Sequence, residues 1–151
     1  METPRVQRTN GKNQHFNELV CMLDASLAES DGDEHDFYNQ FNGLENINHV
    51  IVVCIKKHPI ACGAIKRWDD TTAEVKRMFT KPEYRGKGIG SKVVSALESW
   101  AKELGFKKCI IETGKRQPDA IALYDKTGYS RISNYGPYTG KENSVCFQKF
   151  L

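Results

Sequence analysis

The residues best suited to chemistry form a short glycine-rich segment in the middle of the chain. Residues 85–91 read Arg-Gly-Lys-Gly-Ile-Gly-Ser, between a strand-like segment and a helix-periodic one. Backbone N–H groups at the start of a helix bind phosphate, and glycines let the phosphate approach without obstruction by Cβ atoms. The glycine spacing is neither that of a Walker loop nor that of a dinucleotide-binding fingerprint. The segment predicts a pyrophosphate site, with an unliganded glycine-rich turn as the alternative.

Basic side chains surround this segment. The formal net charge is +3, but residues 1–45 hold three basic and nine acidic side chains, whereas residues 46–151 hold 19 and 10. The basic side chains nearest the glycines are Lys76, Arg77, Lys81, Arg85, Lys87 and Lys92. This cluster favours a polyanionic ligand, the alternative being a solvated charged face. A nucleic-acid partner is disfavoured, because no basic groove interleaved with aromatic residues is evident and the glycine loop suits a compact phosphate.

Other ligands and locations find less support in the residues. The five cysteines are odd in number and lack metal-site spacing, so we expect mostly buried free thiols. The four histidines are scattered, and no bound metal is expected. No apolar run approaches the roughly 20 residues of a membrane span, and the N-terminal residues lack the apolar run of an export signal. We therefore expect no membrane partner and a cytoplasmic location.

The elements that must position the glycine segment alternate between helical and strand patterns. With 151 residues and 39% hydrophobic residues, the chain is expected to form one domain over residues 1–151. Apolar spacing predicts four helices, at residues 14–30, 37–41, 89–104 and 118–127. It predicts seven strands, near residues 5–9, 49–56, 60–67, 73–80, 106–113, 129–135 and 144–151. The second to fourth strands are separated by short turns and are expected to be antiparallel, in a mixed α/β fold.

Two stretches resemble the signatures of the GNAT superfamily of N-acetyltransferases. Residues 85–90 match Arg/Gln-x-x-Gly-x-Gly/Ala at every specified position, and residues 75–82 are similar to the cofactor-binding strand that precedes this loop. Residues 117–129 are similar to the second signature, Asn-x-x-Ala-x-x-Leu-Tyr-x-x-x-Gly-Phe, with Gln117 in place of Asn and Tyr129 in place of Phe. The resemblance implies a GNAT fold: a mixed, mostly antiparallel sheet of about seven strands carries four helices, and two strands splay at the cofactor site.

The resemblance implies acetyl-coenzyme A as cofactor. Its pyrophosphate would lie on the backbone amides of residues 85–90, and its pantetheine arm would enter between the splayed strand ends near residues 78–80 and 111–113. The residues implied to bind the cofactor are Met78, Phe79, Thr80, Arg85, Gly86, Lys87, Gly88, Ile89, Gly90, Ser91, Thr113, Gln117, Ala120 and Tyr124.

Acetyl transfer to a primary amine, by direct attack in a ternary complex, is the reaction that the resemblance implies. An alkyl ammonium has a pKa of about 10.4, so a group must remove a proton before attack. Glu74 lies eleven residues before Arg85, the spacing of the glutamate base in histone-acetylating members of the superfamily. Glu112 is a second candidate, and an ion pair with Lys76 is the structural alternative for Glu74. Tyr124 matches the family's acid position, with a packed structural tyrosine as the alternative.

The acceptor pocket is implied to lie between residues 31–41 and 135–138. Acidic side chains there (Asp31, Asp33, Glu34 and Asp36) would attract a cationic, polyamine-like acceptor, and aromatic ones (Phe37, Tyr38, Tyr135 and Tyr138) would wall its aliphatic part. Arg67 and Arg77 would instead hold the carboxylate of an amino-acid-like acceptor. The candidate acceptor-binding residues are Asp31, Phe37, Tyr38, Arg77, Glu112 and Tyr135.

Three further possibilities stay open at this point. One is that the acceptor is a protein lysine or an N-terminal amine rather than a small molecule. Another is that the chain binds acetyl-coenzyme A without turnover. A homodimer is suggested by the habit of the family alone.

Overall fold

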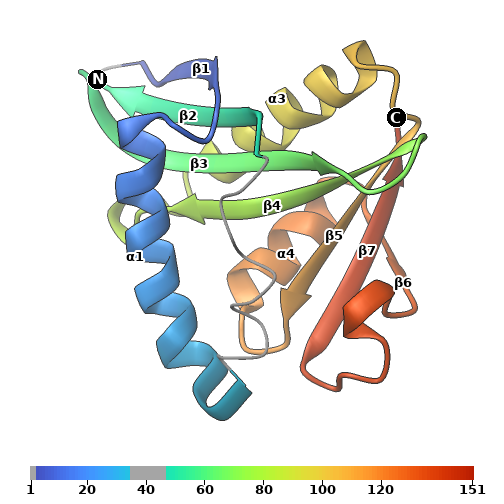
Figure 1. Cartoon of the computed structure of the whole chain (residues 1–151). Helices are drawn as coiled ribbons and strands as arrows, with labels where there is room; N and C mark the ends of the chain where they lie inside the picture. Colours follow the sequence, from blue (N-terminus) through green and yellow to red (C-terminus); the bar gives the residue numbers. More distant parts are fainter. Residues whose placement is uncertain (1–2, 35–46) are drawn as a thin grey trace.

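A seven-stranded sheet organises the computed structural model, which describes residues 3–34 and 47–151 (Figure 1). The strands lie in the order β1-β2-β3-β4-β5-β7-β6, and every neighbouring pair is antiparallel except β4 and β5, which are parallel. Their bounds are β1 (Arg5–Thr9), β2 (His49–Ile55), β3 (His58–Arg67), β4 (Thr72–Thr80), β5 (Lys108–Gly114), β6 (Ser130–Ile132) and β7 (Ser144–Phe150). The predicted mixed, mostly antiparallel sheet of seven strands is confirmed.

Three α-helices are present among the described residues: α1 (Gln14–Asp31), α3 (Ile89–Glu103) and α4 (Pro118–Lys126). Single turns of 3-10 helix are η1 (Gly32–Glu34), η2 (Pro82–Tyr84) and η3 (Gly136–Tyr138). The α1 helix starts where the side chain of Asn13 accepts a hydrogen bond from the N–H of Phe16 (3.0 Å), as an N-cap does. The short helix expected at residues 37–41 lies outside the described residues.

Three strands differ from the prediction by two residues or more at one end. β3 begins at His58 rather than at residue 60, within the expected turn, and the other two differences have a local cause. The strand expected from residue 106 begins at Lys108, because the N–H of Phe106 instead bonds the carbonyl of Ala101 and closes the end of α3 (3.0 Å). The strand expected over residues 129–135 covers only Ser130–Ile132, because the chain turns into η3 shortly afterwards. Both differences reflect capping and turn hydrogen bonds that apolar spacing does not reveal.

The helices cover opposite faces of the sheet. Side chains alternate between the two faces of a strand, so along β2 Val50 and Val52 pack with α1, whereas Ile51 and Val53 pack in the cluster that contains α3 and α4. The α1 cluster is centred on Phe16 and Leu19, both fully buried. On its face of the sheet, α1 contacts β2, β3 and β4. It therefore does not cover the part of this face that is formed by β5 and β7.

The parallel pairing of β4 with β5 is short. Only Thr72–Val75 pair with Lys108–Ile111, after which β4 continues beside β3 and β5 beside β7. The expected splay of two strands is therefore present, and it opens a gap in the middle of the sheet.

A β-bulge lies where β4 leaves β5. The register with β3 shifts between Cys62 and Ala64, and Arg77, on the opposite strand, has a φ of 58°, which a residue with a side chain seldom adopts. The thiol of Cys62 donates to the carbonyl of Arg77 (3.4 Å). This contact helps to hold the bulge in place.

Gly63, opposite the bulge, provides the first testable prediction. A Cβ atom at this position would lie 2.5 Å from Sδ of Met78, 2.8 Å from Cγ1 of Val93 and 3.0 Å from Cδ1 of Leu97. We therefore expect Gly63→Ala to lower the free energy of unfolding by about 1–3 kcal/mol, as overpacked core substitutions do. Urea denaturation measures the change.

Gly114→Ala is the matched control for this substitution, because the nearest atom to its Cβ would be Nδ2 of Asn143 at 3.5 Å, an ordinary contact. The control should stay within about 0.5 kcal/mol of the wild type. Equal effects of the two substitutions would contradict the overpacking argument.

Candidate functional site

The glycine segment forms an open backbone cradle at the start of α3. Gly86 and Gly88 have φ values of 75° and 79°, and a Cβ atom on either would meet nothing within 4 Å. Gly88 is the N-cap of α3 and provides no side-chain cap for the first-turn N–H groups. Uncapped N–H groups and the positive end of the helix dipole favour an anion at this position.

A cavity of about 540 Å³ extends from this cradle to the beginning of α4. Two polar atoms at its lining, Oγ of Ser91 and Nε2 of Gln117, are buried without a hydrogen-bond partner among the described residues. Because buried polar groups are normally paired, these atoms indicate a ligand with hydrogen-bonding groups. The cradle and the two atoms together fit a molecule that carries phosphates and amides.

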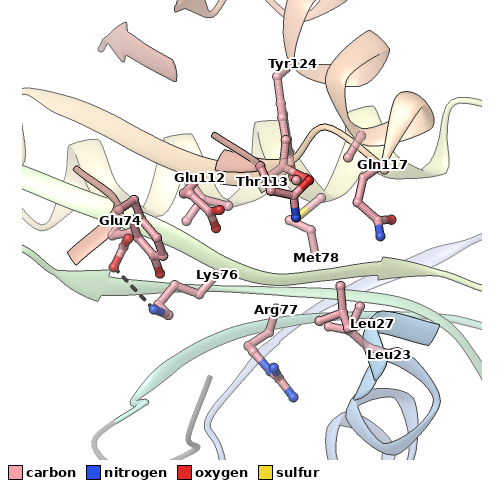
Figure 2. Close-up of a pocket in the computed structure, with 15 residues that line it drawn as sticks. Leu23, Leu27, Glu74, Lys76, Arg77, Met78, Glu112, Thr113, Gln117 and Tyr124 are labelled. Atoms are coloured by element: carbon pink, nitrogen blue, oxygen red, sulfur yellow. Dashed lines mark hydrogen bonds and ion pairs between the residues drawn. The ribbon is translucent and has the colours of Figure 1, made fainter. Parts of the chain in front are cut away.

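A second cavity, of about 120 Å³, lies on the α1 side of β4 and β5 (Figure 2). Its polar lining includes Glu74, Lys76 and Arg77 from β4 and Glu112 from β5. The two cavities share five lining residues: Leu23, Met78, Gln117, Ala120 and Tyr124. They therefore adjoin one another at the splay of the strands.

Glu74 is held in a fixed position in the smaller cavity. Its Oε2 accepts a hydrogen bond from the hydroxyl of Tyr135 (2.7 Å), and its Oε1 lies 3.4 Å from Nζ of Lys76. The carboxylate is buried, with its side chain 8% exposed. Burial and the negative charge of Glu74 both raise the pKa of the Tyr135 hydroxyl, which therefore remains a donor to the carboxylate. The ion pair with Lys76 is present, and it leaves Glu74 facing the cavity.

Tyr124 occupies the boundary between the two cavities. It is a buried residue of α4 whose ring packs edge-on against Tyr129 and Phe147, at centroid distances of 5.9 and 5.7 Å. Figure 2 shows it reaching from α4 toward the splayed strands. Burial, and next the charge of Glu112, raise the pKa of its hydroxyl, so that the phenol stays neutral and can donate a hydrogen bond at physiological pH.

The two arginines proposed to hold a carboxylate lie in different places. Arg67 is 65% exposed and pairs with Asp70 at the surface. Arg77 lines the smaller cavity, and its Nη2 donates to Oδ1 of Asp24 on α1 (2.7 Å). Of this pair, Arg77 alone belongs to the site.

Most of the residues expected to bind the cofactor line the larger cavity. Two do not: Lys87 extends over the ring of Tyr84 (5.6 Å to the centroid), and Thr113 lines the smaller cavity. Glu112 and Tyr138 also line the smaller cavity, and Tyr135 contacts it through Glu74. Phe37 and Tyr38 lie outside the described residues, and nothing is described of the Asp31 side chain.

Sequence reasoning missed several residues of the larger cavity, among them Arg116. Its Nη1 donates to the carbonyl of Ser30 (3.1 Å), which ties the end of α1 to the loop before α4. Ser26 and Ser30 line the same cavity, and their i, i+4 spacing on one helix face was an available signal. Arg116 had no such signal, because its neighbours on α1 lie more than 80 residues earlier in the chain.

The other expected chemistry can be compared with the described residues. None of the described helices is long and apolar enough to cross a membrane. No group of three or more metal-ligating side chains is found in the described part of the chain. All five cysteines are free thiols, of which Cys62, Cys109 and Cys146 are buried, Cys54 is half-buried and Cys21 is exposed. Burial raises the pKa of Cys62 to about 12, so that thiol is unreactive at neutral pH.

The buried phenols lead to a prediction about alkaline pH. Burial raises the pKa of Tyr124, Tyr129 and Tyr135 above the ordinary value of about 10, so the unfolded chain loses these protons first. The free energy of unfolding should be unaffected by these groups below about pH 10 and should fall above it. Phenolate absorbance, followed together with circular dichroism, should show these phenols ionising only as the protein unfolds. Tyr124→Phe should remove one of the phenols that ionise only on unfolding. Ionisation of every tyrosine near pH 10 in the folded protein would contradict the burial of these side chains.

Comparison with known proteins agrees with this geometry. The sequence model of the acetyltransferase (GNAT) family matches residues 16–129. An IAA acetyltransferase of Azospirillum brasilense is 37% identical over 93 residues, 61% of either protein, so the chain spans less than two thirds of this curated relative. A Klebsiella pneumoniae structure designated an acyl-CoA N-acyltransferase is 28% identical, with a TM-score of 0.78 over 99% of this chain and 98% of the other.

A further solved structure is similar in fold. It is a GNAT family acetyltransferase from Elizabethkingia anophelis with acetyl-CoA bound, with 18% identity and a TM-score of 0.69 over the full length of both chains. The match of the family model to most of the sequence, together with the splayed sheet and the glycine cradle, leads to one conclusion. The chain belongs to the GNAT family of acetyltransferases.

Proposed function

We propose that this protein transfers the acetyl group of acetyl-coenzyme A to the primary amine of a small molecule in a ternary complex. The observation that carries the proposal is the pair of adjoining cavities, one with a phosphate cradle and one with a buried carboxylate, which meet at Tyr124. Family membership supports acetyl-coenzyme A as the cofactor. Bound acetyl-coenzyme A supplies a thioester whose carbonyl carbon accepts an amine and whose sulfur leaves as a thiolate.

Three parts of the larger cavity would hold this cofactor. The N–H groups at the start of α3, with Gly86 and Gly88, would bind the pyrophosphate. The hydroxyl of Ser91 and the amide of Gln117 would each gain the partner that they lack. The diverging ends of β4 and β5 would leave backbone groups to pair with the amides of the pantetheine arm.

Glu74 is the proposed proton acceptor for the incoming ammonium. A carboxylate in the acceptor cavity can take one proton from the amine before or during attack, as general bases do. Its hydrogen bond from Tyr135 and its contact with Lys76 fix its orientation. Glu112 lines the same cavity and stays the second candidate for this role.

Tyr124 is the proposed donor to the departing sulfur. In the overall step a C–N bond forms and the C–S bond breaks, while the amine loses a proton and the thiolate gains one. A neutral phenol at the boundary of the cavities can stabilise the thiolate through its O–H, and its high pKa keeps that O–H protonated.

The phosphate cradle can be tested by comparing Gly88→Glu with Gly140→Glu. Both glycines have a φ of 79° and open space around the Cβ position, so the two substitutions impose similar backbone strain. Only Gly88 lines the larger cavity. We expect Gly88→Glu to raise the Kd for acetyl-coenzyme A by at least about 100-fold in isothermal titration calorimetry, because like charges repel at short range. Gly140→Glu should bind as the wild type does, and equal affinity in all three proteins would refute the cradle.

The role of Tyr124 can be tested with Tyr124→Phe, for which Tyr129→Phe is the control. Tyr124 and Tyr129 are both buried and their rings contact one another, but Tyr129 lines neither cavity. Loss of the donor should lower kcat by roughly 10 to 1,000-fold, the usual range for lost acid catalysis, with an unchanged Kd for acetyl-coenzyme A. Thiol release in steady-state assays measures kcat. Unchanged turnover in Tyr124→Phe, or an equal loss in Tyr129→Phe, would remove Tyr124 from the mechanism.

A further inference from the structure

The side chain of Arg77 is buried with much of its hydrogen-bonding capacity unused. Its side chain is 1% exposed, and Nη2 donates to Asp24, but Nε and Nη1 are buried without an acceptor among the described residues. A guanidinium stays protonated in proteins, so this side chain cannot lose its charge to escape burial. Unpaired buried donors of a charged group are costly, which indicates that an acceptor binds there.

The position of Arg77 places this charge beside the acceptor chemistry. Glu74, Lys76 and Arg77 all line the smaller cavity, and Figure 2 shows Lys76 and Arg77 leaving β4 on the same side. The bulge in β4 produces this arrangement. Arg77 lies in the bulge with a φ of 58°, and its side chain therefore lies beside α1, where it contacts Asp24. A strained backbone held at a site is a typical sign of function.

The charges around Arg77 leave its positive charge only partly compensated. Lys76 and Glu74 compensate one another at 3.4 Å. Asp24, the carboxylate that contacts Arg77, is 42% exposed and therefore shared with water. A compact anion in the cavity would complete the hydrogen bonding of the guanidinium. A carboxylate suits better than a phosphate, because Glu74 and Glu112 line the same cavity and would repel a dianion more strongly.

We propose that the acceptor is a primary amine that also carries a carboxylate, as an amino acid does, and that Arg77 binds this carboxylate while Glu74 faces the amine. The proposal rests on the proposed acetyl transfer and names its substrate class. It favours the amino-acid-like acceptor over the polyamine-like one.

The first experiment uses the wild-type protein and needs no substitution at a buried residue. Thiol release from acetyl-coenzyme A is measured with common L-amino acids, with their carboxamides and with the corresponding decarboxylated amines. Within each set the side chain and the amine are the same, and the carboxylate is removed. KM is compared rather than turnover, because the two comparison compounds change the basicity of the amine in opposite directions: the carboxamide lowers the pKa of the amine and decarboxylation raises it. We expect at least one amino acid to have a KM about tenfold or more below that of its carboxamide.

Two variants then separate acceptor binding from a purely structural ion pair. Arg77→Lys keeps the positive charge but loses the planar set of donors, whereas Asp24→Asn removes the carboxylate that contacts Arg77 and keeps an oxygen acceptor. If the only role of Arg77 is to connect β4 with α1, both variants weaken the same contact, that between Arg77 and Asp24, and they should change KM equally. If Arg77 binds the acceptor, Arg77→Lys should raise KM for the amino acid by about 10 to 100-fold, and Asp24→Asn should not raise it.

The outcomes distinguish this inference from the function on which it rests. Acetyl-coenzyme A binding by calorimetry should be the same in both variants and in the wild type. Two results overturn the inference and leave the cofactor assignment standing, provided that acetyl-coenzyme A binds. One is a KM for the amines that lack a carboxylate equal to or below that of the matching amino acids. The other is turnover of no carboxylate-bearing amine in the panel. Equal rises of KM in the two variants also overturn the inference. Absence of acetyl-coenzyme A binding in the wild type refutes the proposed function and the inference together.

Discussion

The short hydrogen-bond ladder between β4 and β5 is the constraint on which the rest of the site depends. The two strands pair only from Thr72 to Val75, and each then follows a different antiparallel neighbour. A strand cannot leave a ladder without exposing backbone groups, so the splay costs free energy unless something else pairs with those groups. The same gap lets α4, on one side of the sheet, present Tyr124 to a cavity on the other side.

The bulge in β4 gives the site its charged character. Without the extra residue, strand alternation would direct Arg77 and Lys76 to opposite faces of the sheet. With it, both line the cavity that contains Glu74. Gly63 accommodates the Met78 side chain on the other face, so the bulge depends on a glycine in the neighbouring strand. Backbone irregularity and side-chain chemistry are therefore coupled at this point of the fold.

The glycine cradle is the part of the site that sequence reasoning described best. Its properties are local, because glycines with φ near 75–79° followed directly by a helix leave the first-turn N–H groups open wherever the segment lies. The order of the strands and of the described helices along the chain was predictable for a similar reason. Apolar periodicity indicates the type of each element and which of its faces is buried. The second signature likewise placed Gln117 and Tyr124 on the cavity without knowledge of their neighbours.

The sequence alone determined the glycine segment at the start of α3, the family and the order of the described elements along the chain, because each depends on residues close together in the chain. Only the tertiary structure decided what surrounds the reactive groups. Tyr135 reaches Glu74 across 61 residues, and Asp24 reaches Arg77 across 53. The bulge is set by the register between β3 and β4, which one strand's pattern cannot specify. Burial of charge and the pairing of donors are properties of contacts between distant segments, and these emerge when the sheet and α1 pack together.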